Sequence, residues 1–405
     1  MARFISVFLV LLFLVSTAIG APSIGNISDN TPGNDQSITI TGTGFTSHNL
    51  DIEWLGGSSG NIESGTAGAA FSGTNWVGDA TNSATQAPLY SADRSHSGSQ
   101  SIMSSFPLES QYDSGFEYQH GADFTEIYAT WWVYFDDGPN LTMGGQWKRW
   151  RIRTTGGYDN DAGEIMESIW LKALNEFGER TLHQAYDMIL CDVSSYGQCY
   201  EDGTGDDRWI ALQPTGAWYR YEVYARASST AGTADAIVDI RYNDMETTST
   251  EVFSYDQLIT RLTENDKWNR FTFQNYWGNQ IAGEDGGDGD GTSEKIYIDD
   301  IYIQIGDRAH IMVGNNATYA SCTHLEIQHP TAWSTTSITF DINQGSFASD
   351  STGYVFVIDS SGVASTGKQV TFGEGGSSVA ASIARTETGS SMVKSGTGCS
   401  FTKGE

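Results

Sequence analysis

The stretch Lys295-Ile-Tyr-Ile-Asp-Asp-Ile-Tyr-Ile-Gln-Ile305 decides the architecture, because it reads as one long strand. Side chains of a strand alternate between its two faces. One face would hold Ile296, Ile298, Asp300, Tyr302 and Gln304, and the other Tyr297, Asp299, Ile301, Ile303 and Ile305. Both faces are largely apolar, which predicts a central strand with one face in a sandwich core and the other covered or lining a groove. Asp299 and Asp300 break this pattern and need partners, since a buried carboxylate is costly unless it is paired or metal-bound.

The rest of the chain predicts an all-β protein. Short alternating runs are separated by Gly, Asn and Asp clusters, as in antiparallel β structure. Two segments, 168–177 and 254–262, compete as short helices. We expect strands at 101–106, 126–135, 146–154, 164–171, 181–190, 218–227, 236–242, 268–276 and 295–305.

Three passages carry a family resemblance: Ser95-His-Ser-Gly-Ser-Gln-Ser-Ile102, Trp218-Tyr-Arg-Tyr-Glu-Val-Tyr-Ala-Arg226 and the long strand at 295–305. They resemble the concanavalin A-like jelly-roll sandwiches of lectins, laminarinases and polysaccharide lyases. The resemblance implies a jelly roll over residues 58–306 and describes the fold better than the activity.

Segments on either side of the jelly roll resemble a TIG-type immunoglobulin-like domain. Residues 22–27 and 36–45 are similar to its opening strands, and the remaining strands reappear at 310–314, 333–340 and 353–362. We therefore expect a sandwich split by an inserted jelly roll; the alternative is two unrelated pieces. The expected division is 1–20 signal peptide, 21–57 TIG-like strands, 58–306 jelly roll, 307–373 immunoglobulin-like part and 374–405 low-complexity tail.

The first twenty residues predict secretion. A short apolar run follows Arg3 and ends in small residues before Ala21, as in a cleaved secretory signal. No second apolar run follows, so membrane insertion is not expected. The formal net charge of -29 repels nucleic acid phosphates and anionic lipids alike. We expect an extracellular protein that binds neither nucleic acid nor membrane.

Positive charge is concentrated at Trp147-Lys-Arg-Trp-Arg-Ile-Arg153, in contrast to the acidic chain around it. Strict alternation would place Arg149, Arg151 and Arg153 on one face. Guanidinium groups in a row suit carboxylates or sulfates, which points to an acidic polysaccharide. The alternative is that these arginines satisfy the surplus Asp and Glu of the chain.

The strand at 268–276 adds polar groups that fit β-elimination of a uronate. It would place Arg270, Thr272, Gln274 and Tyr276 on one face. In jelly-roll polysaccharide lyases a comparable strand ends in a tyrosine that acts as acid or base, so the resemblance implies this role for Tyr276. The reaction also needs a cation or amide on the carboxylate and a base for the C5 proton.

The catalytic set expected for a lyase is His183, Tyr276 and Arg151, with Tyr186 an alternative to Tyr276. His183 could take the proton as a neutral imidazole, although a lone histidine on a strand is more often structural.

The ligand-binding set expected for either activity adds an aromatic residue. One of the adjacent Trp131 and Trp132 must face away from the core, where it offers a platform for sugar stacking. We expect the polysaccharide to contact Arg149, Arg151, Arg153, Gln274 and Trp132.

An acidic, glycine-rich loop at 284–291 precedes the long strand. Hard oxygen ligands on a flexible loop suit calcium, so Asp285, Asp288 and Asp290 together with Asp300 are candidate ligands for a structural Ca²⁺. The loop lacks the spacing of an EF-hand, and a solvated acidic hairpin tip is the alternative.

The four cysteines suggest disulfides in an exported chain. Cys191 and Cys199 flank a short loop that a disulfide would close. Cys322 and Cys399 are left for each other or as free thiols.

Together these features predict a secreted carbohydrate-recognition protein that binds an acidic polysaccharide through a jelly-roll cleft. Two alternatives remain: a polysaccharide lyase that cleaves a uronate-containing glycan, and a non-catalytic surface or matrix protein with protein partners. The fold alone does not separate them.

Overall fold

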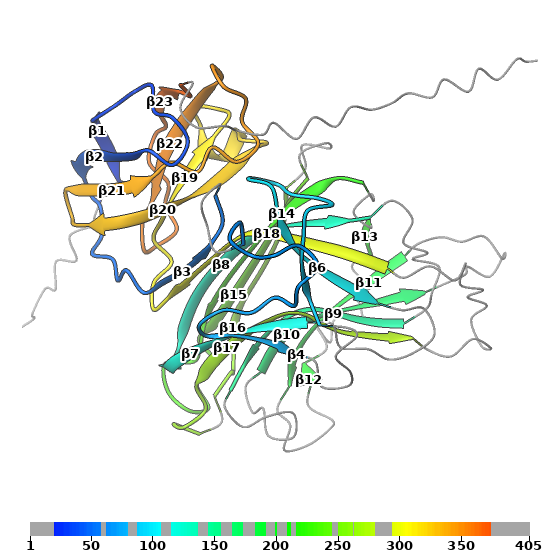
Figure 1. The fold of residues 1–405 in the computed structure, drawn as a ribbon. Helices are drawn as coiled ribbons and strands as arrows, with labels where there is room; N and C mark the ends of the chain where they lie inside the picture. The colour runs from blue at the N-terminus through cyan, green and yellow to red at the C-terminus, as the bar shows by residue number, and fades with distance from the viewer. Residues whose placement is uncertain are drawn as a thin grey trace, which may run out of the picture.

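The protein is all-β in the part of the chain that the computed structural model describes (Figure 1). Its one helical turn is the 3₁₀ segment Tyr319–Ser321. Within that part, no helix has the length and apolarity needed to cross a membrane. Described are residues 20–57, 62–79, 87–106, 115–136, 145–154, 164–172, 183–191, 199–200, 209–211, 216–244, 250–261, 263–279 and 294–373.

Two eight-stranded sheets form the larger sandwich. Sheet I has the order β12(Cys199–Tyr200), β11(His183–Cys191), β10(Glu164–Lys172), β9(Gly145–Arg153), β17(Trp268–Asn279), β7(Gly115–Phe124), β4(Trp76–Asp79), with β13(Trp209–Ala211) beside β11. Sheet II has the order β16(Thr250–Leu258), β15(Ala236–Asp244), β14(Trp218–Arg226), β8(Glu126–Phe135), β18(Glu294–Ile305), β6(Ser101–Phe106), β5(Leu89–Ser91), with β3(Ile52–Leu55) beside β18.

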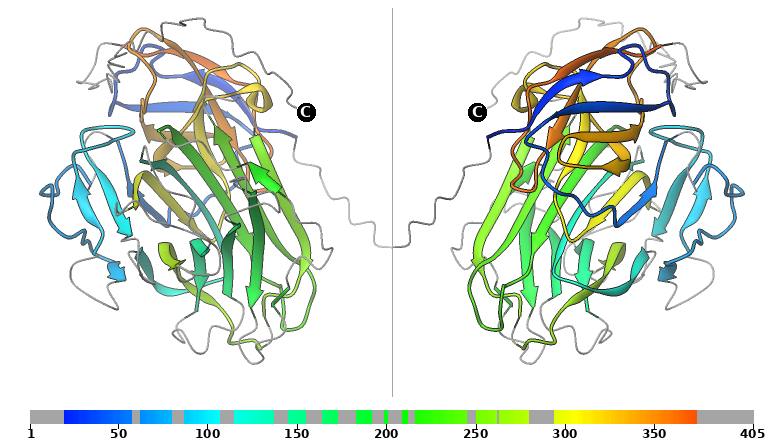
Figure 2. Two further views of the ribbon diagram at one scale, coloured as in Figure 1. Left: turned by 90° about the vertical axis from the view of Figure 1, so that its right-hand side faces the viewer. Right: turned by 90° about the vertical axis from the view of Figure 1, so that its left-hand side faces the viewer.

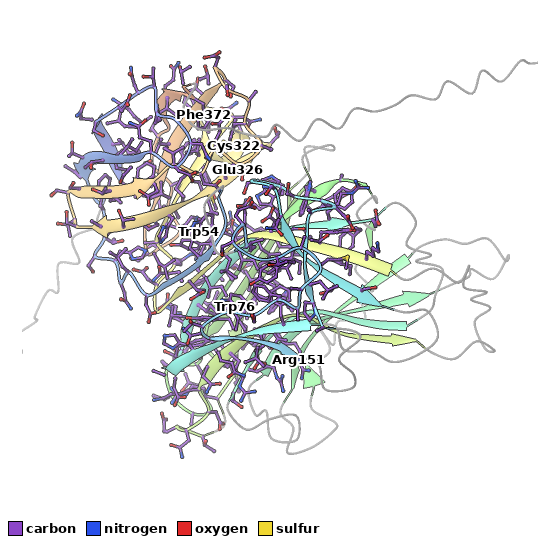
Figure 3. All side chains as sticks on the ribbon, in the orientation of Figure 1. Trp54, Trp76, Arg151, Cys322, Glu326 and Phe372 are labelled. Carbon is purple, nitrogen blue, oxygen red and sulfur yellow. The ribbon has the colours of Figure 1, made fainter. Side chains whose placement is uncertain are left out.

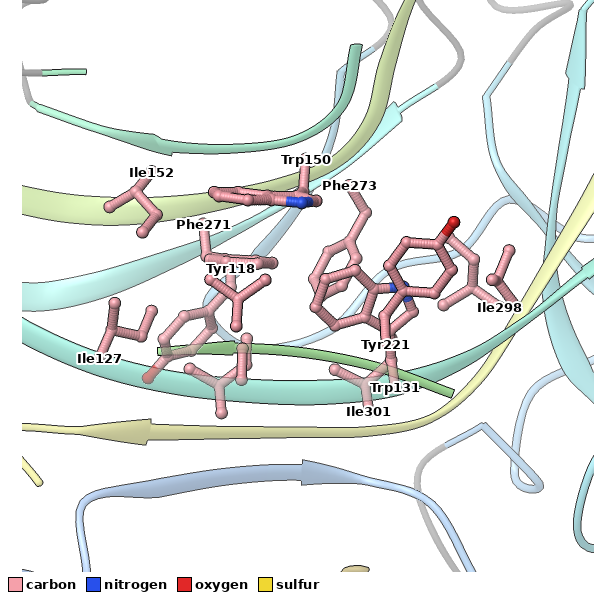
Figure 4. Packing of buried hydrophobic residues seen from close by; sticks show 14 of the residues in the cluster. Tyr118, Ile127, Trp131, Trp150, Ile152, Tyr221, Phe271, Phe273, Ile298 and Ile301 are labelled. Carbon is pink, nitrogen blue, oxygen red and sulfur yellow. The ribbon is translucent and has the colours of Figure 1, made fainter. Parts of the chain in front are cut away.

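An aromatic core joins the two sheets (Figure 4). Trp150 from sheet I stacks on Phe271 with ring centroids 6.1 Å apart, and Trp131 from sheet II stacks on Tyr221 at 5.4 Å. Trp131 also meets Phe273 edge-on across the sandwich at 5.1 Å. Each such ring buries on the order of 150–250 Å² of surface, so this cluster supplies much of the hydrophobic stabilisation. The jelly-roll sandwich expected from the sequence is the observed fold class.

The strand boundaries follow the sequence pattern closely. The strands expected at 101–106 and 126–135 are β6 and β8 with the same ends. The helical alternatives are wrong where the structure describes them: residues 254–258 belong to β16 and 168–172 to β10, while 173–177 and 262 lie outside the described residues. Both segments contain β-branched or aromatic residues, and pairing with a neighbouring strand decides their conformation.

The long strand β18 departs from strict alternation at Asp299 and Asp300. The register with β8 shifts between Asp299 and Tyr302, and Asp300 has a φ of 47°. A β-bulge of this kind adds a residue and turns the following side chains over. As a result Ile296 and Ile301 both lie in the sandwich core, whereas strict alternation had put them on opposite faces.

The smaller sandwich is a seven-stranded sheet, sheet III, built from both ends of the described chain. Its strands in order are β1(Ser23–Ile27), β2(Ser37–Thr43), β21(Ser337–Asp341), β20(Leu325–Trp333), β19(His310–Gly314), β22(Thr352–Ile358) and β23(Lys368–Thr371).

Its N-terminal strands lie beside C-terminal strands in both views of Figure 2, with Ile38 opposite Phe340. Strand β20 changes partner at Pro330: its first half pairs with β19 and its second half with β21. The sheet therefore folds over a single core. The expected domain boundaries and the TIG assignment stay predictions.

The two sandwiches share an apolar contact. Tyr128, Tyr224 and Tyr302 from the outer face of sheet II pack in one cluster with Met312 and Phe356 of sheet III. Sheet III thus covers one outer face of the large sandwich, and the outer face of sheet I lies on the opposite side (Figures 1 and 3).

Candidate functional site

The cationic strand β9 lies at the centre of sheet I, between β10 and β17. Trp150 and Ile152 point into the sandwich core, so Arg151 and Arg153 belong to the opposite, outer face of the sheet. Arg151 is labelled in Figure 3, on the side of the large sandwich away from Glu326.

Neighbouring strands extend this outer face. Thr272 of β17 pairs with Arg151 on one side and with Glu117 of β7 on the other. Arg270 pairs with Arg153 in the next row. Paired residues share a face of the sheet, so these side chains form two adjacent rows across three strands.

Glu117 is the acid at the centre of the group. Its carboxylate lies 3.2 Å from Arg153 Nη1 and 3.3 Å from Arg270 Nη1. It also accepts hydrogen bonds from Thr272 Oγ1 at 3.0 Å and from Gln119 Nε2 at 2.8 Å. Glu117 therefore fixes two arginines from two different strands in one orientation.

We call this group the arginine face; its residues are Glu117, Gln119, Arg151, Arg153, Arg270 and Thr272. The group carries three guanidinium cations and one carboxylate, a formal charge of +2 in a chain of -29. Arg151 and Arg153 are 4% and 2% exposed, and the side chain of Arg270 is 26% exposed. Internal pairing, the alternative considered for the sequence, applies to Arg153 and Arg270, which share Glu117, and Arg151 is not without a partner either.

The alternation expected across β9 is interrupted at Arg149. Glu167 and Ser168 are consecutive in β10 but pair with Trp150 and Lys148, so β9 holds one extra residue there. A bulge separates the two ends of the strand, and a common face for Arg149 and Arg151 does not follow from alternation. The side chain of Arg149 lies outside the described residues.

The proposed proton-transfer residues are placed by backbone register alone, because their side chains lie outside the described residues. Tyr276 pairs with Lys148, and Gln274 lies two residues before it on β17. The register between β17 and β9 shifts between Phe273 and Tyr276, so alternation does not assign Gln274 and Tyr276 to the arginine face.

His183 is remote from Arg151 in the sheet. Arg151 pairs with Met166 of β10, and His183 pairs with Lys172 of the same strand. These six residues span about 20 Å at roughly 3.3 Å per residue. The register therefore does not bring His183 and Arg151 together, and a catalytic role for His183 stays a prediction.

Trp132 does not offer the sugar platform expected of it. Trp131 faces the core and Trp132 faces outward, but Trp132 is only 1% exposed. Its ring stacks on His96 at 3.9 Å, and its Nε1 donates to Glu326 Oε2 at 3.0 Å. Sheet III and the loop before β6 therefore cover the ring completely.

A second cluster of polar groups lies between the two sandwiches. His96 precedes β6, Asp300 is in β18 and Glu326 is in β20 of sheet III. His96 Nδ1 is 2.7 Å from Asp300 Oδ2, and His96 Nε2 is 3.4 Å from Glu326 Oε1. Burial would lower the pKa of His96, but the carboxylates of Glu326 and Asp300 outweigh burial and raise it.

Asp299 and Asp300 both have hydrogen-bond partners, as expected for buried carboxylates. Asp299 Oδ2 accepts the backbone N–H of His96 at 2.7 Å, and Asp300 Oδ1 accepts from Ser97 Oγ at 2.7 Å and from Gly57 N at 2.9 Å. Burial and the neighbouring Asp300 raise the pKa of Asp299 well above its usual range.

Both oxygens of Asp300 have hydrogen-bond partners in the protein, and its role as a calcium ligand stays a prediction. Asp285, Asp288 and Asp290 lie outside the described residues, and calcium at their loop stays a prediction.

A buried ion pair also lies on the outer face of sheet II. Arg220 Nη1 is 2.8 Å from Glu222 Oε2, and Arg241 Nε approaches the other oxygen at 3.8 Å. Burial would raise the pKa of Glu222, but Arg220 outweighs it and holds that pKa at about 2. Nearby, Tyr128 Oη is 3.2 Å from His310 Nε2, and burial lowers the pKa of His310 to about 4.

The backbone register gives the relative position of two of the four cysteines. Cys191 and Cys199 are directly opposite each other in the β11–β12 ladder. Their side chains lie outside the described residues, so the disulfide stays a prediction. Cys322 is a buried free thiol, and Cys399 also lies outside the described residues.

Comparison with known proteins gives matches at the level of fold. No protein-family profile and no curated protein sequence matches the chain. Among solved structures, an alginate lyase matches with 15% identity and a TM-score of 0.43, over 64% of this chain and 98% of that one. An endo-β-1,4-glucuronan lyase from the fungus Trichoderma reesei matches with 11% identity and a TM-score of 0.36, over 59% of this chain and 91% of that one. Lectin I from Ulex europaeus, in complex with the methyl glycoside of α-L-fucose, matches with 10% identity and a TM-score of 0.31, over 58% of this chain and 94% of that one.

Proposed function

We propose that this protein binds an acidic polysaccharide through the arginine face of sheet I. The observation that carries the proposal is the gathering of Arg151, Arg153 and Arg270 on one face of paired strands, in a chain of net charge -29. Guanidinium groups bind carboxylates and sulfates through paired N–H donors. A repeating polyanion meets the same cationic rows with each successive sugar.

The internal pairing of Glu117 supports this role. Arg153 and Arg270 are held on one carboxylate, so they lose little conformational freedom when a ligand arrives. The partial exposure of Arg270 gives an anion a point of contact with the buried part of the group. The surrounding negative chain disfavours anions elsewhere on the surface.

Retention on immobilised polysaccharides tests the proposal. We expect the full chain to be retained by a uronan or a sulfated glycan and not by a neutral glucan. The Arg270→Ala variant should bind about tenfold more weakly, because one charge-assisted contact is lost. Arg94→Ala removes an equally charged but more exposed residue near Asp136 and serves as the control. Equal retention of wild type and Arg270→Ala, or no retention by any acidic glycan, would refute the proposal and favour a structural or adhesive role.

A lyase activity on the same face is the second candidate. It is supported by the backbone register, which sets Tyr276 beside Lys148, three residues along β9 from Arg151. In this mechanism Arg151 neutralises the uronate carboxylate, Gln274 donates a hydrogen bond to it, and Tyr276 transfers the protons. His183 is not used in this mechanism, because the register does not bring it beside Arg151.

Formation of an unsaturated uronate, followed by its ultraviolet absorbance, tests the lyase activity. Tyr276→Phe should abolish product formation while retention on the glycan persists, and His183→Gln should leave both unchanged. Retention without product from the wild-type chain would reject the lyase and keep the binding function.

A further inference from the structure

The imidazole of His96, buried between the two sandwiches, has one ring nitrogen without a hydrogen-bond partner. Its Nδ1 lies 2.7 Å from Asp300 Oδ2, which favours a proton on Nδ1. Its Nε2 has no hydrogen-bond partner and faces Glu326 Oε1 at 3.4 Å, while the side chain is only 2% exposed. A ring-nitrogen lone pair aimed at a buried carboxylate oxygen is repulsive, so the position calls for a cation between the two atoms.

A second histidine reaches the same carboxylate oxygen. His324 Nε2 lies 2.6 Å from Glu326 Oε1, and Ser346 Oγ lies 3.2 Å from that nitrogen. His324 stacks on Phe347, and His96 stacks on Trp132, so both rings are held in their planes. Two imidazole nitrogens and one carboxylate oxygen thus converge from the two sandwiches.

The backbone around Glu326 keeps this carboxylate in place. Gly345 has a φ of 53°, and a Cβ at this position would overlap the Glu326 carboxyl group. The N–H of Ser346 donates to Glu326 Oε1 at 3.1 Å, and Trp132 Nε1 holds the other oxygen. A ligand set with its outer contacts already made needs little rearrangement to bind an ion.

We propose that His96 Nε2, His324 Nε2 and Glu326 Oε1 bind a divalent transition-metal ion of the Zn²⁺ type between the two sandwiches. Ligand atoms about 2.1 Å from a tetrahedral zinc lie about 3.4 Å apart. This value matches the separation of His96 Nε2 and Glu326 Oε1. The shorter contact of His324 is a hydrogen bond whose proton the metal replaces, with release of that proton on binding. The Ser346 hydroxyl or a water beside it completes the coordination.

Asp300 acts on this site through His96 and is not itself a ligand. His96, Asp300 and Glu326 do have ligand-type atoms within 4.8 Å of one another. However, Asp300 binds the Nδ1 edge of the ring, whereas the proposed metal faces Nε2 on the other edge. Asp300 is a positioning residue that orients the ring and increases its basicity.

The donor set selects the class of metal. Two imidazoles and one carboxylate suit zinc and neighbouring first-row metals, whereas calcium and magnesium prefer six or more oxygen ligands. The site is therefore distinct from the calcium predicted at the acidic loop, and it is independent of polysaccharide binding by the arginine face.

Metal titration of the full chain tests the proposal. After treatment with a chelator, the protein should take up one equivalent of Zn²⁺ in calorimetry, and Co²⁺ should give the strong visible absorption of a tetrahedral site. His324→Gln should weaken Zn²⁺ binding at least a hundredfold and abolish the Co²⁺ band, and Asp300→Asn should weaken binding about ten- to a hundredfold.

His329→Gln is the matched control. This histidine lies on β20, the strand that also holds Glu326, and its ring stacks on Trp54. It should leave both metal signals unchanged, and thermal unfolding of each variant shows that it is folded. Absence of the Co²⁺ band in the wild-type chain, or a band and a Zn²⁺ affinity that survive His324→Gln, would overturn the metal site and leave a proton as the cation between His96 and Glu326.

Discussion

The two outer faces of the large sandwich use charge in opposite ways. On the face covered by sheet III, Arg220 and Glu222 form a close pair at 2.8 Å, and each is less than a tenth exposed. On the arginine face, Arg153 and Arg270 share Glu117, and Arg151 pairs along the backbone with Thr272. On the covered face Arg220 and Glu222 are both buried and neutralise each other within the protein. On the arginine face the side chain of Arg270 stays partly exposed, which is where we propose that an anion from outside binds.

The largest effect that this comparison predicts is on the covered face. Glu222→Gln leaves the buried Arg220 without its carboxylate, and we expect a loss of about 3–5 kcal/mol in the free energy of unfolding. Denaturant unfolding measures it. Glu264→Gln, which removes the exposed partner of Arg261, should change stability little. If both variants unfold alike, the covered pair is not structural.

The pH dependence of stability tests the same face through His310. Its folded pKa of about 4 lies below the ordinary value of 6.5, so the unfolded chain binds the proton first as pH falls. Stability that is complete above pH 6.5 should decrease toward pH 4, by up to about 1.4 kcal/mol per pH unit from this group. His310→Gln should remove this part of the slope. Equal slopes for wild type and variant would contradict the buried neutral histidine.

A glutamate-to-glutamine change on the arginine face can be compared directly with Glu222→Gln on the covered face. Glu117→Gln removes the acid shared by Arg153 and Arg270, and we expect a smaller loss of about 1–3 kcal/mol because water reaches Arg270. The formal charge of the face rises from +2 to +3, so binding of an acidic polysaccharide should become tighter. Weaker binding with intact stability would show that Glu117 itself contacts the glycan.

The smallest effect concerns a neutral hydrogen bond on the covered face. Tyr128→Phe removes the hydroxyl that lies 3.2 Å from His310 Nε2, and we expect a loss of about 1 kcal/mol. Tyr354→Phe, a partly buried tyrosine of sheet III, is the control. A loss as large as that of Glu222→Gln would mean that the face depends on the hydrogen-bond network and not on the ion pair.

Local periodicity in the sequence was enough to predict the all-β fold and most strands of the large sandwich, including β6 and β8 with their ends. It failed at the bulges in β9 and β18, because an inserted residue changes the face of its neighbours without changing composition. That is why the core positions of β18 could not be read by alternation.

The cationic strand β9 could be predicted from the sequence, but the carboxylate that pairs with its Arg153 could not. Glu117 lies in β7, a strand that was not expected, and it reaches Arg153 and Thr272 only through pairing with β17. Glu326 was missed for the same reason, since it meets His96 from a different sandwich. Ser95-His96-Ser97 gave a signal for fold only, and the role of His96 depends on contacts more than 200 residues away in sequence.

The most direct test of the account is the affinity of wild type, Arg270→Ala and Arg270→Glu for a soluble uronan at low and high salt, with a neutral glucan alongside. If the arginine face binds the glycan, affinity for the uronan falls from wild type to Ala to Glu, salt weakens the wild-type complex most, and the glucan does not bind. Uronan affinities that are equal across the three proteins, or a neutral glucan bound as tightly as the uronan, would contradict the arginine face as the binding site.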